Sequence, residues 1–74
     1  MRMISPAALH ALRSQFTPGI RVELLQMEDT QAPPVGTKGT VIGVDDTGSL
    51  MVRWDNGSSL NVLYGIDRCR IITE

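Results

Sequence analysis

The chain has 74 residues, of which 42% are hydrophobic and 20% are charged, and its formal net charge is -1. This length allows one small domain with a single core, and the composition excludes a disordered tail and a strongly basic nucleic-acid binder. A lone cysteine, Cys69, cannot form an intramolecular disulfide, and the apolar runs are too short to cross a bilayer. We therefore expect a soluble, cytoplasmic protein without a targeting segment.

Residues 1–17 are predicted to form an accessory helix at the N-terminus. Ser5 can cap its start, Pro6 can occupy the first helical position, and the Thr-Pro-Gly sequence at 17–19 ends it. One side of this helix carries an apolar stripe that consists of Leu9, Leu12 and Phe16. The stripe must be buried, either against its own domain or against a second copy of the chain in a homodimer.

Residues 18–74 are predicted to form a mainly β domain, a five-stranded SH3-like small barrel. A first strand over 20–27 shows alternation of apolar and polar residues, and a long loop over 28–36 follows it. A three-stranded meander is expected between Thr37 and Leu60, and a last strand over 68–73. A short helical turn over 63–67 is expected between the meander and this last strand.

Two tight turns set the expected register of the meander. Asp46-Thr47-Gly48 and Asp55-Asn56-Gly57 are each predicted to be three-residue loops that end on a left-handed glycine. These loops pair apolar residues on one face: Val44 with Leu50, Ile42 with Val52, Val52 with Leu60, and Leu50 with Val62. Trp54 follows the same period and belongs in the core.

Several short stretches together resemble a bacterial family described only as a domain of unknown function. They include Gly-Thr-Lys-Gly-Thr-Val at 36–41, Gly-Val-Asp-Asp at 43–46 and Trp-Asp-Asn-Gly-Ser-Ser-Leu at 54–60. The resemblance covers roughly residues 18 to 73 and leaves the helix outside. It implies an SH3-like fold and a setting in firmicute-type bacteria, often on phages and conjugative elements, and it implies no mechanism.

The sequence offers no convincing catalytic, metal or cofactor site. His10 and Cys69 lie on segments that the predicted fold does not bring together, so neither gains the partner that catalysis needs. Cys69 stands between two arginines that can lower its pKa, but a free cysteine is usually a small buried hydrophobe. The acids of Asp45-Asp46 are explained by turn chemistry, because further calcium ligands are missing. We expect a protein that is not an enzyme and uses no cofactor.

Two binding surfaces are candidates. A protein-binding groove is predicted between the long loop and the turn after the meander, and its residues are Ala32, Pro33, Pro34 and Tyr64. A basic strip for nucleic acid is predicted on the barrel, and its residues are Lys38, Arg53, Arg68 and Arg70.

The favoured hypothesis is a non-enzymatic protein-interaction module of a phage or mobile element. One concrete form of it is a counter-defence protein, such as an anti-CRISPR, that occludes a host complex. The alternative is a nucleic-acid-binding accessory protein that uses the basic strip. Membrane binding is not expected.

Overall fold

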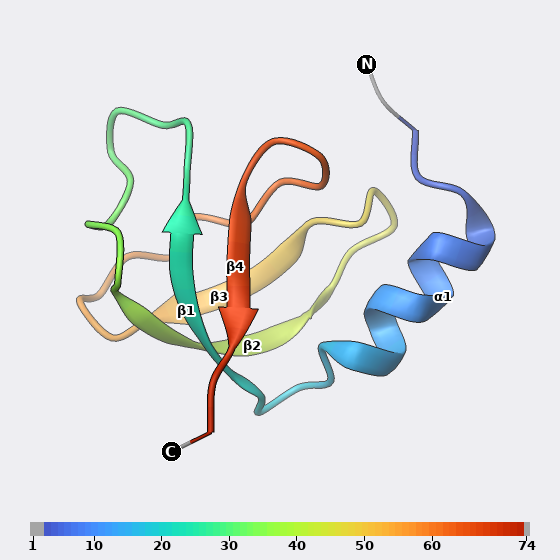
Figure 1. The fold of residues 1–74 in the computed structure, drawn as a ribbon, viewed down its shortest axis with the longest axis horizontal. Helices are drawn as coiled ribbons and strands as arrows, with labels where there is room; N and C mark the ends of the chain where they lie inside the picture. Colours follow the sequence, from blue (N-terminus) through green and yellow to red (C-terminus); the bar gives the residue numbers. More distant parts are fainter. Residues whose placement is uncertain (1–2, 74) are drawn as a thin grey trace.

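The computed structural model describes residues 3–73 as one helix followed by four strands (Figure 1). The elements are α1 (Pro6–Gln15), β1 (Arg21–Gln26), β2 (Lys38–Val44), β3 (Leu50–Trp54) and β4 (Arg68–Ile71). The strands form an open antiparallel sheet in the order β3-β2-β1-β4. The expected mainly β fold with an N-terminal helix is confirmed, and the described residues form four strands where five were predicted.

Helix α1 begins and ends as its sequence predicts. The Ser5 hydroxyl accepts the Ala8 N–H at 3.1 Å and Pro6 is the first helical residue. The helix lies beside the sheet, next to the β2–β3 hairpin (Figure 1). None of its residues is fully buried, but the predicted stripe of Leu9, Leu12 and Phe16 is half-buried and Phe16 packs against the core.

The core lies on one face of the sheet, where side chains from three strands and the segment after the second hairpin meet. Its buried members are Val22, Leu24, Val41, Leu50, Val52, Trp54 and Val62. Alternation along β1 and β3 accounts for five of these seven positions, as the period of two requires. The prediction that Trp54 belongs in the core is confirmed.

Both hairpin loops have the predicted form. The Asp45 N–H donates to the Ser49 carbonyl at 3.0 Å, which leaves three residues in the loop, and Gly48 has a φ of 85°. The second loop closes in the same way between Trp54 and Ser58, and Gly57 has a φ of 93°. A left-handed glycine at the third loop position is the geometry that favours this loop length.

The register of the first hairpin differs from the prediction beyond its first pair. Val44 lies opposite Leu50 as expected, but Val52 lies opposite Val41 and not opposite Ile42. A bulge between Val41 and Gly43 inserts one residue, so Val41 turns into the core and Ile42 is 50% exposed. The prediction for Ile42 was therefore wrong.

The predicted third strand of the meander is replaced by a segment that touches the sheet at one point. Val62 and Leu50 exchange two backbone hydrogen bonds of 2.9 Å, which confirms that pair. Leu60 does not pair with Val52, because its carbonyl accepts the indole N–H of Trp54 at 2.8 Å. Residues 58–61 therefore form no regular ladder with β3.

Candidate functional site

A groove of about 690 Å³ opens between the N-terminal segment, the β2–β3 hairpin loop and the turn at residues 63–66. We call it the Tyr64 groove, and its lining residues are Met3, Ile4, Asp46, Thr47, Ser49, Leu63, Tyr64, Gly65 and Ile66. Its apolar side chains come from two segments that lie far apart in the chain. Its polar side chains all come from the hairpin loop.

The apolar side of the Tyr64 groove is open to solvent. Met3 is 88% exposed, Ile66 is 52% exposed and Leu63 is 45% exposed. Single exposed apolar residues are ordinary on protein surfaces, whereas several of them around one concavity are typical of a binding surface. The Tyr64 groove is thus the strongest candidate site among the described residues.

Gly48 lets the walls of the groove approach the hairpin. A Cβ atom at this position would lie 2.7 Å from Cδ1 of Ile4 and 3.3 Å from Cβ of Tyr64. Both the positive φ of Gly48 and its missing side chain are therefore required for this arrangement. The hairpin glycine links the predicted turn directly to the shape of the groove.

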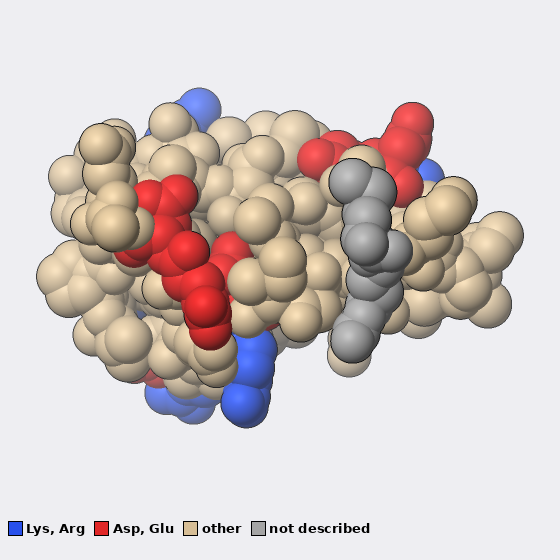
Figure 2. Space-filling model, turned by 90° about the horizontal axis from the view of Figure 1, so that it is seen from above, with Lys and Arg blue, Asp and Glu red and all other residues tan. Residues whose placement is uncertain are grey.

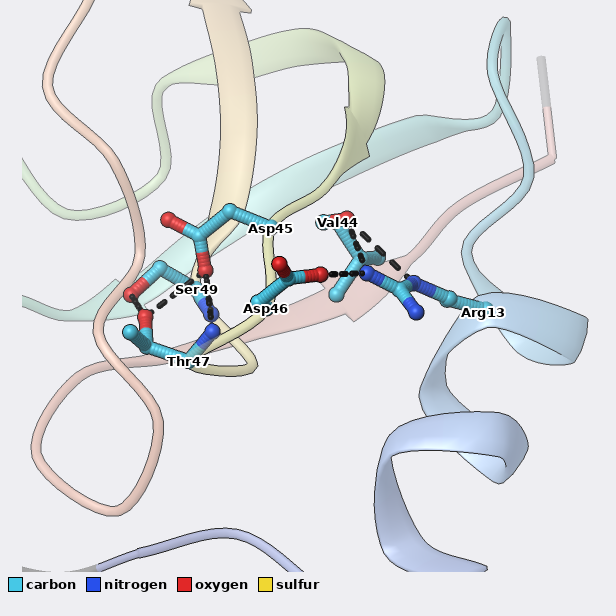
Figure 3. Close-up of polar contacts among 6 residues, drawn as sticks. All are labelled: Arg13, Val44, Asp45, Asp46, Thr47 and Ser49. Carbon is cyan, nitrogen blue, oxygen red and sulfur yellow. Dashed lines mark hydrogen bonds and ion pairs between the residues drawn. The ribbon is translucent and has the colours of Figure 1, made fainter. Parts of the chain in front are cut away.

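The polar side of the groove is held by the Asp45 carboxylate (Figure 3). One oxygen, Oδ1, accepts the Thr47 hydroxyl at 2.7 Å and the backbone N–H groups of Thr47 and Ser49 at 3.0 Å each. The Thr47 hydroxyl is the largest cause that lowers the pKa of Asp45 below 3.8; burial opposes it, and the two backbone hydrogen bonds add to it. Turn chemistry thus explains Asp45, as the sequence indicated.

Arg13 fastens α1 to the same hairpin (Figure 3). Its Nη2 lies 2.8 Å from Oδ1 of Asp46, and its Nη2 and Nε donate to the Val44 carbonyl at 3.3 and 3.4 Å. The Asp46 side chain nonetheless keeps 97% of its surface exposed. An exposed ion pair of this kind contributes only about 0 to 1 kcal/mol, so Asp46 stays available at the edge of the groove.

Asp67 holds the turn that carries Tyr64. Its buried carboxylate accepts the N–H of Leu63 at 2.9 Å and the N–H of Glu28 at 3.0 Å. One side chain therefore closes the turn and joins it to the loop after β1. Asp67 was not identified as a structural residue from the sequence. Its position four residues after Leu63, whose N–H it binds, is nonetheless a local signal in the sequence.

A smaller cleft of about 230 Å³ lies behind the Tyr64 groove and shares Tyr64 with it. Leu12 and Phe16 of α1 line this cleft together with Cys69 of β4. The helix stripe therefore faces its own chain, which is the first of the two arrangements that the sequence left open.

A family model described as "Domain of unknown function (DUF4314)" matches residues 5–72. The chain belongs to this family. The match includes α1, so the helix that we expected to be accessory lies inside the part that this DUF4314 domain shares with its family. A search among curated proteins gave no match.

The DUF4314 domain does not place the predicted protein-binding residues in one groove. Tyr64 lines the groove, whereas the loop that carries Ala32, Pro33 and Pro34 lies on the far side of β1 (Figure 1) and lines neither cleft at Tyr64. Pro33 is buried, Ala32 is half-buried and Pro34 is exposed. Sequence reasoning missed Ile4 and Ile66, because an isolated isoleucine outside a strand gives no signal of which surface it joins.

Three of the predicted basic residues, Lys38, Arg53 and Arg70, lie on the outer face of the sheet, where acids alternate with them, whereas Arg68 lines the smaller cleft. Lys38, Glu23 and Arg70 form one row across β2, β1 and β4, and Nε of Arg70 donates to Glu23 Oε1 at 2.6 Å. Arg53 lies in the next row, beyond Thr40 and Arg21.

Arg21 makes a bidentate pair with Asp55 at 2.8 and 2.6 Å, and this hydrogen bonding is the largest cause that lowers the pKa of Asp55. Among residues 3–73, Lys38, Arg53 and Arg68 form no ion pair. Phosphate binding gains affinity with each concentrated cation, so the interleaved acids weaken this face as a nucleic-acid site.

Cys69 packs against the core, and burial raises the pKa of its thiol to about 11. The neighbouring arginines do not lower the pKa of Cys69, so the alternative of an activated thiol is corrected and Cys69 is a small, partly buried hydrophobe. Residues 3–73 hold no cluster of three or more histidine, cysteine or acidic side chains placed to bind a metal. Within the same range, no helix is long and apolar enough to span a bilayer.

Proposed function

We propose that this DUF4314 domain is a non-enzymatic protein-interaction module of a phage or mobile element and that the Tyr64 groove is its binding surface. The exposed apolar wall of the groove supports the proposal. Protein interfaces place such side chains at their centre and polar residues at their rim, and here Asp46 and Thr47 border Ile66 and Leu63.

We interpret the fold as SH3-like. Two tight hairpins, a long loop after β1 and a turn directly before β4 support this interpretation. The segment at 58–62, with its single bridge to β3, takes the place of the fifth strand. Counter-defence against a host complex is the concrete form of the function that we favour, because a small module can act by occlusion without chemistry of its own.

Affinity capture from a bacterial lysate tests the proposed function. The bait is the full chain, either wild type or with Ile66→Ser in the groove, and each lysate is used with and without nuclease. Ile42→Ser is the matched control, because Ile42 and Ile66 are 50% and 52% exposed and Ile42 lies outside the groove. Circular dichroism confirms that both variants are folded.

We expect wild type and Ile42→Ser to retain the same stoichiometric protein in both nuclease arms, and Ile66→Ser to lose it. Equal capture by the two variants would refute the groove as the binding surface. Capture that disappears on nuclease treatment would favour the nucleic-acid alternative and direct attention to Lys38, Arg53, Arg68 and Arg70.

A further inference from the structure

The carboxylates around the Tyr64 groove are grouped on both sides of its apolar turn. Figure 2 shows two acidic groups on the face seen from above, one over the loop that follows β1 and one over the β2–β3 hairpin, with mostly uncharged surface between them. Glu28 and Asp29 are exposed in the loop, and Asp45 and Asp46 belong to the hairpin. The apolar turn at 63–66 lies between these two segments.

One acidic group borders the groove, and the other is connected to the turn that forms its apolar wall. Asp46 lines the Tyr64 groove, and the Asp67 carboxylate accepts the backbone N–H groups of Glu28 and Leu63, which holds the start of the acidic loop beside the turn. Among residues 3–73, the opposing cations are two: Arg13, which pairs with Asp46, and Arg68, which lines the smaller cleft. The carboxylates outnumber these guanidinium groups, so the surroundings of the groove carry a negative potential.

We propose that the occupant of the Tyr64 groove is a cationic amphipathic segment of a partner protein, an inference that rests on the proposed function. Its apolar side chains lie against Leu63, Tyr64 and Ile66, and its lysine or arginine side chains lie against the acids on either side. Charge complementarity selects this class of partner over an equally apolar acidic segment, because like charges at the rim oppose association.

Three synthetic, fluorescently labelled peptides test the inference. Each has about 15 residues, the length at which an isolated helix becomes marginally stable. The first has leucine at helical spacing and lysine elsewhere, the second has glutamate in place of lysine, and the third has serine in place of leucine. Binding to the full chain is measured by fluorescence anisotropy at low and high salt.

We expect the leucine–lysine peptide to bind at least about tenfold more tightly than either other peptide at low salt. Its advantage over the glutamate peptide should shrink at about 1 M salt, where the Debye length is only about 3 Å. Ile66→Ser should weaken its binding on the order of tenfold, whereas Ile42→Ser should leave it within about twofold.

A pair of charge variants distinguishes the effect of a carboxylate at the groove rim from the effect of the net charge of the whole molecule. Asp46→Asn and Ser59→Lys each raise the net charge by one, the first by removing a carboxylate and the second by adding an ammonium group, but Ser59 is exposed near the second hairpin and lies outside both clefts. Asp46→Asn should weaken the leucine–lysine peptide about threefold, and Ser59→Lys should change it less, because exposed pairs contribute up to about 1 kcal/mol.

Three results would overturn the inference. Equal binding of the lysine and glutamate peptides, lost in Ile66→Ser, would leave the groove as a binding surface and refute its charge selection. No binding of the leucine–lysine peptide at millimolar concentration would refute the partner class while lysate capture still tests the proposed function. A dimer in sedimentation that Ile66→Ser dissociates would show that the occupant is a second copy.

Discussion

Gly39 is a position where one added methyl group should lower the stability of the fold. A Cβ atom there would lie 2.7 Å from Cγ1 of Val52, 2.8 Å from Cε3 of Trp54 and 2.9 Å from the carbonyl oxygen of Arg53. All three distances are shorter than real Cβ contacts, and the last involves backbone that cannot rotate away. Gly39→Ala must therefore separate β2 from β3 or displace the buried indole.

The expected loss follows from two opposing contributions. Overpacking a core costs about 1 to 3 kcal/mol, while replacing a strand glycine by alanine recovers about 0.5 to 1 kcal/mol of backbone entropy. Because all three contacts are under 3.0 Å and one is with backbone, the overpacking cost lies in the upper part of its range, at about 2 to 3 kcal/mol, and Gly39→Ala should lower the free energy of unfolding by about 1 to 2 kcal/mol. For a domain of this size, that loss corresponds to a fall in Tm of roughly 5 to 15 °C.

Thermal unfolding followed by circular dichroism measures the effect, and Gly43→Ala is its matched control. Gly43 lies in the same strand, has no positive φ, and its added Cβ would meet only Cε of Met51 at 3.1 Å, the end of a flexible side chain. Gly43→Ala should leave Tm within about 4 °C of wild type. Equal stability of the two variants would refute the close approach of Gly39 to Trp54.

Two further predictions concern titratable groups. The pKa of Asp45 in the folded state lies below 3.8, so its contribution to stability is present above about pH 4 and is lost as pH falls further. The difference in urea midpoint between wild type and Asp45→Asn should therefore shrink between pH 5 and pH 3, and a constant difference would contradict this reasoning. The pKa of Cys69 is about 11, so its reaction with Ellman's reagent at pH 8 should be at least about tenfold slower in folded than in urea-unfolded protein. Equal rates would show that the thiol is not buried.

Local chemistry made the turns and the helix start predictable. Gly48 and Gly57 follow polar residues that bond their own backbone, and Ser5 precedes a proline, so each signal is contained within about four residues. No distant segment can easily override such a signal. The predictions of both turns and of the helix start therefore agree with the structure.

Features that depend on distant side chains were not predictable in the same way. The bulge that turns Ile42 outward is marked in the sequence only by Gly43, and the glycine fits an unbulged strand equally well. The bond from the Trp54 indole to the Leu60 carbonyl replaces a strand pair, and no alternation pattern can indicate it. Of the residues around the Tyr64 groove, only Tyr64 itself was predicted, because Ile4 and Ile66 meet solely through the fold.

The two faces of the domain differ in how their charges are balanced, and this difference bears on function. On the outer face of the sheet, Glu23 and Asp55 each engage an arginine, while Lys38 and Arg53 form no ion pair among residues 3–73 and leave this face with an excess of cations. Among residues 3–73, Asp46 is the one carboxylate around the Tyr64 groove that pairs with a cation, and the apolar wall beside it is exposed. An apolar groove flanked by carboxylates gains from a cationic, apolar partner, because such a partner matches both its exposed wall and its charges. Binding should therefore take place at the groove.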